Sequence, residues 1–209
     1  MEFFDRAKAI LFNPKEEWVV IEAENPPHAK VFAGYLLILA LIPAIVIFIR
    51  IYWAFSFASY GFNASFFEST ALKWAIISAL TQTVLIIVSA YSAAAIINAF
   101  SEQYGRTKDF NQAFALVAYS FTPLCVAGIL YIYSPLAFLV PLVGCYGFYL
   151  LYLGYESQLK PAADKKIACL IISLIAVVAV WAILSKVVPA ITQQIMIEST
   201  KNSINSMMR

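Results

Sequence analysis

Charge is scarce in this sequence, and so are the residues that most often carry chemistry. Only 12% of the 209 residues are charged, whereas an ordinary soluble domain has about 25%. The single histidine, His28, excludes a histidine metal cluster. The three cysteines lie in apolar stretches and none has a CxxC partner, which excludes a disulfide framework and a zinc site of the usual spacing. We therefore expect no metal and no cofactor.

Catalytic signatures are missing as well. The sequence contains no Ser/His/Asp set, no HExxH motif and no glycine-rich phosphate loop. Its net charge of +2 is too small to indicate a nucleic-acid partner. We expect a protein that is not an enzyme and binds no nucleic acid.

What the sequence has in place of charge is long apolar runs. Residues 110–155 are 46 consecutive positions without Asp, Glu, Lys, Arg or His. A helix of that length extends roughly 70 Å, more than twice the ~30 Å hydrocarbon core of a bilayer. The runs are too long and too continuously apolar for barrel strands, and lipid favours helices because it cannot satisfy backbone polar groups. The sequence predicts an all-α, polytopic integral membrane protein with a bundle of five transmembrane helices.

The predicted spans divide the chain into three parts. The five spans cover about 31–53, 74–100, 111–132, 135–155 and 167–188. Tyr133-Ser134-Pro135 is the predicted turn between the third and fourth spans, because proline starts a helix well and continues one badly. The fifth span is expected to end near Lys186 and Pro189. The three expected parts are a cytoplasmic amphipathic segment (1–30), the bundle (31–188) and a short extracytoplasmic tail (189–209).

The basic residues predict the orientation. With the N-terminus inside, the inner segments hold nine of the 14 Lys and Arg residues and the outer segments hold five. Positive charge favours the cytoplasmic side. The sequence therefore predicts a cytoplasmic N-terminus and an external C-terminus.

The first thirty residues read as two short amphipathic helices. Asn13 and Pro14 are expected to start the second helix, with Asn13 as N-cap and Glu16 completing a capping box. An Asn25-Pro26-Pro27 linker ends it. The pair either lies on the inner membrane face or packs on the cytoplasmic end of the bundle. With the loop after the second span, it supplies the candidate interaction surface: Phe3, Phe4, Leu11, Trp18, Tyr104 and Arg106.

Polar residues inside the second and third spans form a second candidate set. Their spacing places those of the second span on one helical face, which suits either close helix packing or the lining of a polar pathway. Pro123 predicts a break in the third span, and Pro43 and Pro141 predict similar breaks in the first and fourth. The set comprises Ser78, Gln82, Ser89, Asn98, Tyr119, Ser120, Thr122 and Pro123.

Glycines recur near helical spacing in the fourth span. Gly144, Gly147 and Gly154 would permit close approach of another helix. Tyr155 suits the inner aromatic belt, and Tyr131 suits the outer one.

Several of these features together resemble the Yip1 domain family. They are Asn13-Pro14 followed by Trp18, five spans with the N-terminus inside, and Ala118-Tyr119-Ser120 leading to Pro123. The resemblance implies a five-helix membrane bundle with a cytosolic N-terminus. Eukaryotic members act in early secretory traffic and associate with small Rab-type GTPases. This sequence lacks their long hydrophilic N-terminal region and keeps only Tyr-Gly of their Asp-Leu-Tyr-Gly-Pro motif, so it resembles a compact prokaryotic member of the cytoplasmic membrane.

Two functions remain open on this basis. The first is a non-enzymatic membrane protein that acts through protein-protein or lipid interaction, with membrane lipid, other membrane proteins or itself as partners. The alternative is a small-solute or ion permease or channel, with a polar pathway between the second, third and fourth helices. Gln82 and Thr122 would face a hydrated cavity in a permease, and would be packed dry in an interaction protein.

Overall fold

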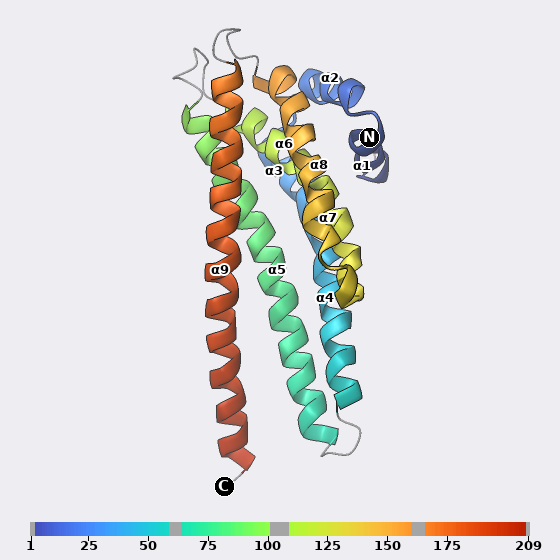
Figure 1. Cartoon of the computed structure of the whole chain (residues 1–209), viewed down its shortest axis with the longest axis vertical. Helices are drawn as coiled ribbons and strands as arrows, with labels where there is room; N and C mark the ends of the chain where they lie inside the picture. The colour runs from blue at the N-terminus through green and yellow to red at the C-terminus, as the bar shows by residue number, and fades with distance from the viewer. Residues whose placement is uncertain (1–2, 59–63, 101–108, 160–165, 208–209) are drawn as a thin grey trace.

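The fold is entirely helical over the part of the chain that the structure describes. The computed structural model describes residues 3–58, 64–100, 109–159 and 166–207 (Figure 1). Five helical segments are long and apolar enough to cross a membrane: His28–Phe57, Thr70–Phe100, Phe110–Ile132, Ser134–Gln158 and Val177–Glu198. The predicted all-α, polytopic membrane architecture is confirmed.

Two short helices precede the first span. α1 (Phe3–Phe12) and α2 (Pro14–Glu24) are joined at Asn13. The predicted helix start is confirmed because Pro14 is the first residue of α2, but the Asn13 side chain makes no capping hydrogen bond. Asn25 ends α2 in the left-handed conformation (φ 37°), and its N–H donates to the carbonyl of Ile21. The predicted Asn25-Pro26-Pro27 linker is therefore observed.

The first and second spans form a long antiparallel pair. The first span comprises three consecutive helical segments: α3 (His28–Val31), the π-helical turn η1 (Phe32–Leu36) and α4 (Leu37–Ala58). α4 continues through Pro43 without the predicted interruption. The second span lies within α5 (Ala64–Phe100), a helix of 37 residues that packs along α4.

The third span is broken at the predicted place. α6 (Phe110–Ser120) ends at Phe121, and α7 (Thr122–Ala127) begins with Pro123 in its first turn. Proline removes a backbone donor and clashes with the carbonyl four residues earlier, so the helix restarts here. Asp109 caps α6 by accepting hydrogen bonds from the N–H groups of Asn111 and Gln112.

The fourth span returns beside the third. The 3-10 helices η3 (Gly128–Ile132) and η4 (Ser134–Leu136) form the predicted turn, with Tyr133 extended between them. α8 (Leu139–Gly154) and the π-helical turn η5 (Tyr155–Leu159) complete the span. Pro141 falls in the first turn of α8, where proline is tolerated. The predicted break inside the fourth span at Pro141 is therefore wrong.

α9 (Lys166–Met207) is a single helix of 42 residues that contains Pro189. The helix was expected to end near Lys186 and Pro189, yet it continues for 18 more residues to Met207. Contacts with α5 support this extension, since Thr192 hydrogen-bonds Thr81 (2.9 Å) and Thr200 accepts from the Trp74 indole (3.4 Å). An extracytoplasmic location for residues 189–209 stays a prediction.

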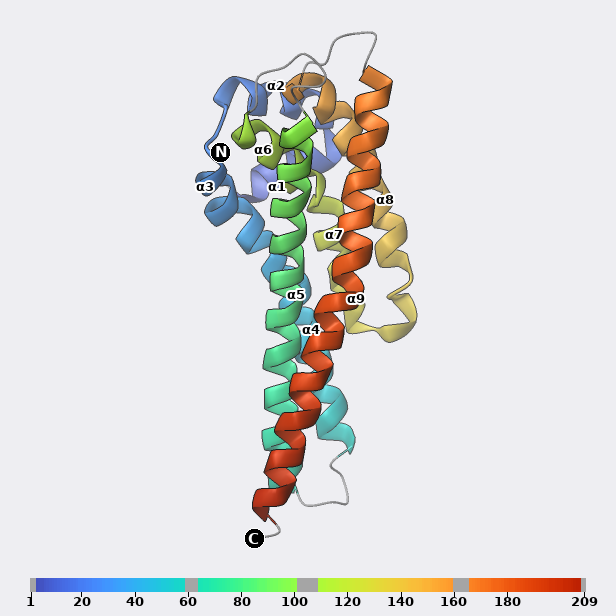
Figure 2. The same ribbon diagram turned by 90° about the vertical axis from the view of Figure 1, so that its left-hand side faces the viewer.

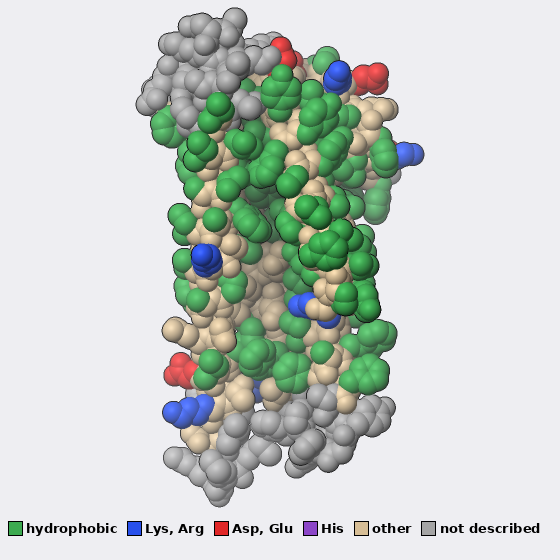
Figure 3. Space-filling model, in the orientation of Figure 1, with side chains coloured by type: hydrophobic (Ala, Val, Ile, Leu, Met, Phe, Trp, Pro, Cys, Tyr) green, Lys and Arg blue, Asp and Glu red, His purple; other side chains and the backbone are tan. Residues whose placement is uncertain are grey.

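The helices of the five spans occupy different parts of the molecule. α9 lies beside α5 in both views, and α6, α7 and α8 occupy only the half of the molecule nearest α2 (Figures 1 and 2). Most of the third span is buried, whereas α9 is largely exposed. Hydrophobic side chains cover the outer faces of α8 and α9 (Figure 3), as expected where lipid is the solvent. The two termini lie at opposite ends of the bundle (Figure 1).

Candidate functional site at the N-terminal end of the bundle

α1 and α2, here called the N-terminal unit (residues 3–24), pack on the bundle with one face. Ile10, Trp18 and Ile21 are fully buried in the main hydrophobic core. Burying a large apolar side chain contributes about 1.5–3 kcal/mol. The unit is therefore a part of the folded bundle and not a detached segment.

A buried ion cluster fixes α1 against α2. The Arg6 guanidinium donates to Glu17 and to Glu24, and both Arg6 (6% exposed) and Glu17 (4% exposed) are buried. Burial alone lowers the pKa of the Arg6 guanidinium, but the hydrogen bond to Glu24 and the charge of Glu17 outweigh it and raise that pKa above its ordinary value. Arg6 therefore stays charged and depends on these carboxylates for compensation.

Two tyrosines lie beneath Arg6. The Arg6 Cζ atom is 6.0 Å from the centre of the Tyr119 ring, within cation–π range. Tyr119 contacts Tyr35 with ring centres 4.6 Å apart. The Thr122 hydroxyl donates to the Tyr119 carbonyl (2.6 Å), so the Tyr35 hydroxyl donates to Thr122 (2.7 Å). The Phe3 ring packs against the Tyr35 ring, with ring centres 5.3 Å apart. Side chains from α1, η1, α6 and α7 thus meet at one point.

The Trp18 side chain lies at the contact between α2 and α8. Its ring makes an edge contact with Tyr119 at 6.1 Å. A methyl group at Gly154 would lie 2.5 Å from two atoms of the Trp18 ring, so only glycine permits this approach. The Trp18 carbonyl accepts hydrogen bonds from Ser157 (3.0 Å) and Gln158 (3.4 Å) of η5. The predicted close packing at Gly154 is confirmed, and the partner is Trp18.

The candidate interaction residues separate into different environments. Phe4 is 79% exposed, whereas Trp18 is 1% exposed and belongs to the core. Phe3 and Leu11 are half-buried and pack against that core. Tyr104 and Arg106 lie outside the described residues. The burial of Arg6 has no signal in the sequence, because its partners Glu17 and Glu24 lie 11 and 18 positions away and no local pattern marks them.

The candidate pathway residues also separate. Gln82 and Ser89 of α5 line a cavity of about 230 Å³ among α4, α5, α7, η3 and α9. α8 does not line it, so the cavity differs from the expected site between the second, third and fourth helices. Thr122 and Pro123 are buried, and Tyr119 lies beneath the Arg6 guanidinium. Ser120 is buried beside a second cavity, whereas Ser78 and Asn98 are only partly buried and border neither.

Comparisons with known proteins give one match. The model of the Yip1 domain matches residues 8–184 of this chain. No curated protein and no solved structure matches. The matched range contains Trp18, Tyr119 and Gly154, which meet at the docked face of the N-terminal unit.

Proposed function

Because the chain belongs to the Yip1 domain family, we propose that it is a non-enzymatic membrane protein that acts through its N-terminal unit. The unit is held on the bundle by Arg6 and Trp18 and turns its other face to the surrounding lipid. Its contact partner is the leaflet at the N-terminal end, which the distribution of basic residues predicts to be the cytoplasmic leaflet.

The depth of α1 carries this proposal. The Leu11 carbonyl accepts a hydrogen bond from Tyr146 (2.9 Å), and Phe3 contacts Tyr35. Tyr35 and Tyr146 both belong to segments long enough to cross the membrane. α1 therefore packs against the sides of two candidate membrane spans.

Exposed apolar side chains lie on the outer side of the unit, beside the exposed charged residues Asp5, Lys8, Lys15 and Glu16. Phe4 is 79% exposed and Phe12 is 76% exposed, although Ile10 between them is fully buried. On α2, Val19 is 61% exposed beside the buried Trp18. An amphipathic helix whose apolar side chains enter the headgroup–acyl boundary is a common form of membrane contact. The two expected arrangements of this segment, on the bundle and on the membrane, are thus compatible.

Spin labels at two exposed positions test the proposal. In a variant with its three cysteines replaced by alanine, a label at Phe12→Cys in lipid nanodiscs is expected to collide with oxygen and to be shielded from a water-soluble nickel complex. A label at Lys15→Cys, which is exposed on α2, serves as the matched control and is expected to show the opposite pattern. Equal access of the nickel complex to both labels would contradict lipid contact.

The cavity that contains Gln82 supports a second candidate, a small-solute or ion permease. Its lining also includes Ser89, Tyr131 and Ser185, which are polar groups within candidate spans. Thr122, which a permease would turn toward water, is instead fully buried and bonded to Tyr35. The burial of Thr122 favours the first function, a membrane protein that acts through interaction and not through transport.

Flux measurements separate the two candidates. Proteoliposomes are expected to pass K⁺, Cl⁻, glycerol and water no faster than protein-free vesicles, and Gln82→Leu is expected to change nothing. A solute flux that depends on the protein and falls in Gln82→Leu would establish the permease. Ser78→Leu, on the same helix but away from the cavity, is the control.

A further inference from the structure

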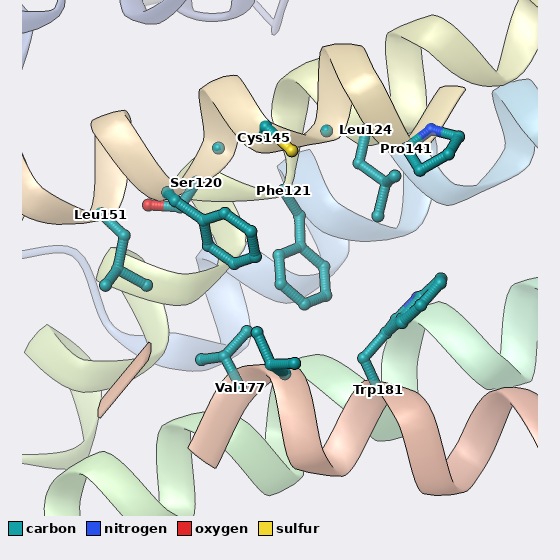
Figure 4. Close-up of a pocket in the computed structure, with 12 residues that line it drawn as sticks. Ser120, Phe121, Leu124, Pro141, Cys145, Leu151, Val177 and Trp181 are labelled. Carbon is teal, nitrogen blue, oxygen red and sulfur yellow. The ribbon is translucent and has the colours of Figure 1, made fainter. Parts of the chain in front are cut away.

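Two neighbouring cavities follow the inner face of α9. The first, of about 270 Å³, lies between α6, α7, α8 and α9 (Figure 4). The second, of about 230 Å³, is the cavity that contains Gln82 and Ser89. Phe121, Leu124 and Trp181 line both, so the two cavities adjoin, and together they are called here the α8–α9 groove.

The α8–α9 groove opens toward lipid. Among the described residues α9 packs mainly along α5 and has no extended contact with α8. The surface is hollowed between these two helices (Figure 3). In Figure 4, Phe121 and Leu124 project toward Val177 and Trp181 of α9 across the opening. Every lining residue belongs to a helical segment that is long and apolar enough to cross a membrane.

The lining indicates the chemistry of an occupant. The wall of the first cavity is almost wholly apolar, from Pro141 and Leu151 on α8 to Val177 on α9. An apolar cavity of this kind does not hold water. A helix with its side chains is about 10–12 Å wide, too wide for a cavity of 270 Å³. A single flexible hydrocarbon chain is both apolar and narrow enough for this cavity.

Polar groups occur at defined points of the same groove. Ser120 borders the first cavity and Ser89 the second; each is at most 3% exposed, and neither hydroxyl has a hydrogen-bond partner. A buried hydroxyl without a partner costs about 1–3 kcal/mol. Gln82 and Ser185 lie toward the far end, where Lys186 is exposed.

We propose that the α8–α9 groove binds one acyl chain of a bilayer phospholipid. From Val177 to Pro189 the groove follows 13 residues of α9, about 18 Å between the first and last Cα atoms. This is close to half of an ~30 Å hydrocarbon core, the depth that one acyl chain spans. The chain lies in the apolar part, and the ester and phosphate groups lie toward Gln82, Ser185 and the Lys186 cation. The site is separate from the N-terminal unit.

A photoreactive lipid tests the site. The wild-type protein is reconstituted into phosphatidylcholine nanodiscs that contain phosphatidylcholine with a diazirine on one acyl chain, illuminated, digested and analysed by mass spectrometry. Adducts are expected to concentrate on groove residues such as Cys145 and Val178. The expected excess over Val143 and Ile183, which are exposed but border no cavity, is about threefold or more, because a chain that fills a void gains dispersion contacts on all sides.

Two variants provide the matched comparison. Cys145→Trp fills the groove and is expected to remove most of the groove adducts, while Val143→Trp on the same helix leaves them unchanged. Adducts spread evenly over all lipid-facing helices of the wild type would overturn the proposal, whether or not either variant folds. Efficient coupling of two copies through Cys145 by a short bifunctional thiol reagent would also overturn it, by identifying a second chain as the occupant.

Discussion

Replacing Arg6 with methionine is expected to release the N-terminal unit from the bundle. The change leaves Glu17, which is 4% exposed, without its cation. Removing one partner of a buried ion pair costs about 3–5 kcal/mol, because the remaining charge is uncompensated. Because the ion cluster joins α1 and α2 to each other and to Tyr119, its loss is expected to let these two helices detach from the bundle more often.

Hydrogen exchange measures this opening directly. In detergent micelles or nanodiscs, amide protection in α1 and α2 of Arg6→Met is expected to fall more than a hundredfold, because every 1.4 kcal/mol is a factor of ten. Trypsin is expected to cut faster at Lys15. Lys8→Met, at an exposed position on the same helix, is the control and is expected to stay within about 0.5 kcal/mol of the wild type.

A double variant identifies the cause. Arg6→Met combined with Glu17→Met removes both buried charges and is expected to regain most of the lost protection, because hydrophobic replacements of a buried ion pair are often neutral or stabilising. Glu24 remains partly exposed to solvent and needs no partner. If Arg6→Met were as well protected as Lys8→Met, the ion cluster would not hold the unit in place.

Gly154→Ala is the second change with a large expected effect. The added methyl group would lie 2.5 Å from Trp18 ring atoms and 2.7 Å from a Leu116 methyl group. The indole ring is rigid and fully buried, so α2 must shift away from α8. Overpacking of this kind costs about 1–3 kcal/mol. We expect a lower melting temperature and, with Trp53, Trp74 and Trp181 replaced by phenylalanine, a red-shifted Trp18 emission.

Gly34→Ala is the matched control. Apart from its chain neighbours and its own helix backbone, no atom lies within 4 Å of the position that its methyl group would occupy. Alanine also favours helix over glycine by about 1 kcal/mol, so this variant is expected to match or exceed the wild-type stability. Trp18→Leu, which gives the methyl group room, is expected to reduce the added cost of Gly154→Ala in a double-mutant cycle. Equal melting temperatures for Gly154→Ala and Gly34→Ala would show that Trp18 of α2 does not pack tightly against Gly154 of α8.

Features that depend on neighbouring residues and on the solvent can be predicted from the order of the amino acids alone. Long apolar runs require helices in lipid, since no water satisfies the backbone there. The start of α2 at Pro14, the break before Pro123 and the turn at Tyr133-Ser134-Pro135 follow from the geometry of proline and of its neighbours. These features were predicted within a few residues because their causes lie within a few residues.

The contacts between distant residues depend on how the helices pack and could not be predicted from the sequence. Trp18 contacts Gly154 from 136 positions away, and Tyr146 reaches Leu11 from 135 positions away. α9 continues past Pro189 because α5 supports it through Thr81 and Trp74. The α8–α9 groove exists because α9 packs along α5 and leaves α8. No local pattern records such choices, since in lipid every apolar helix face is already satisfied and small residues, hydrogen bonds and shape select the partner.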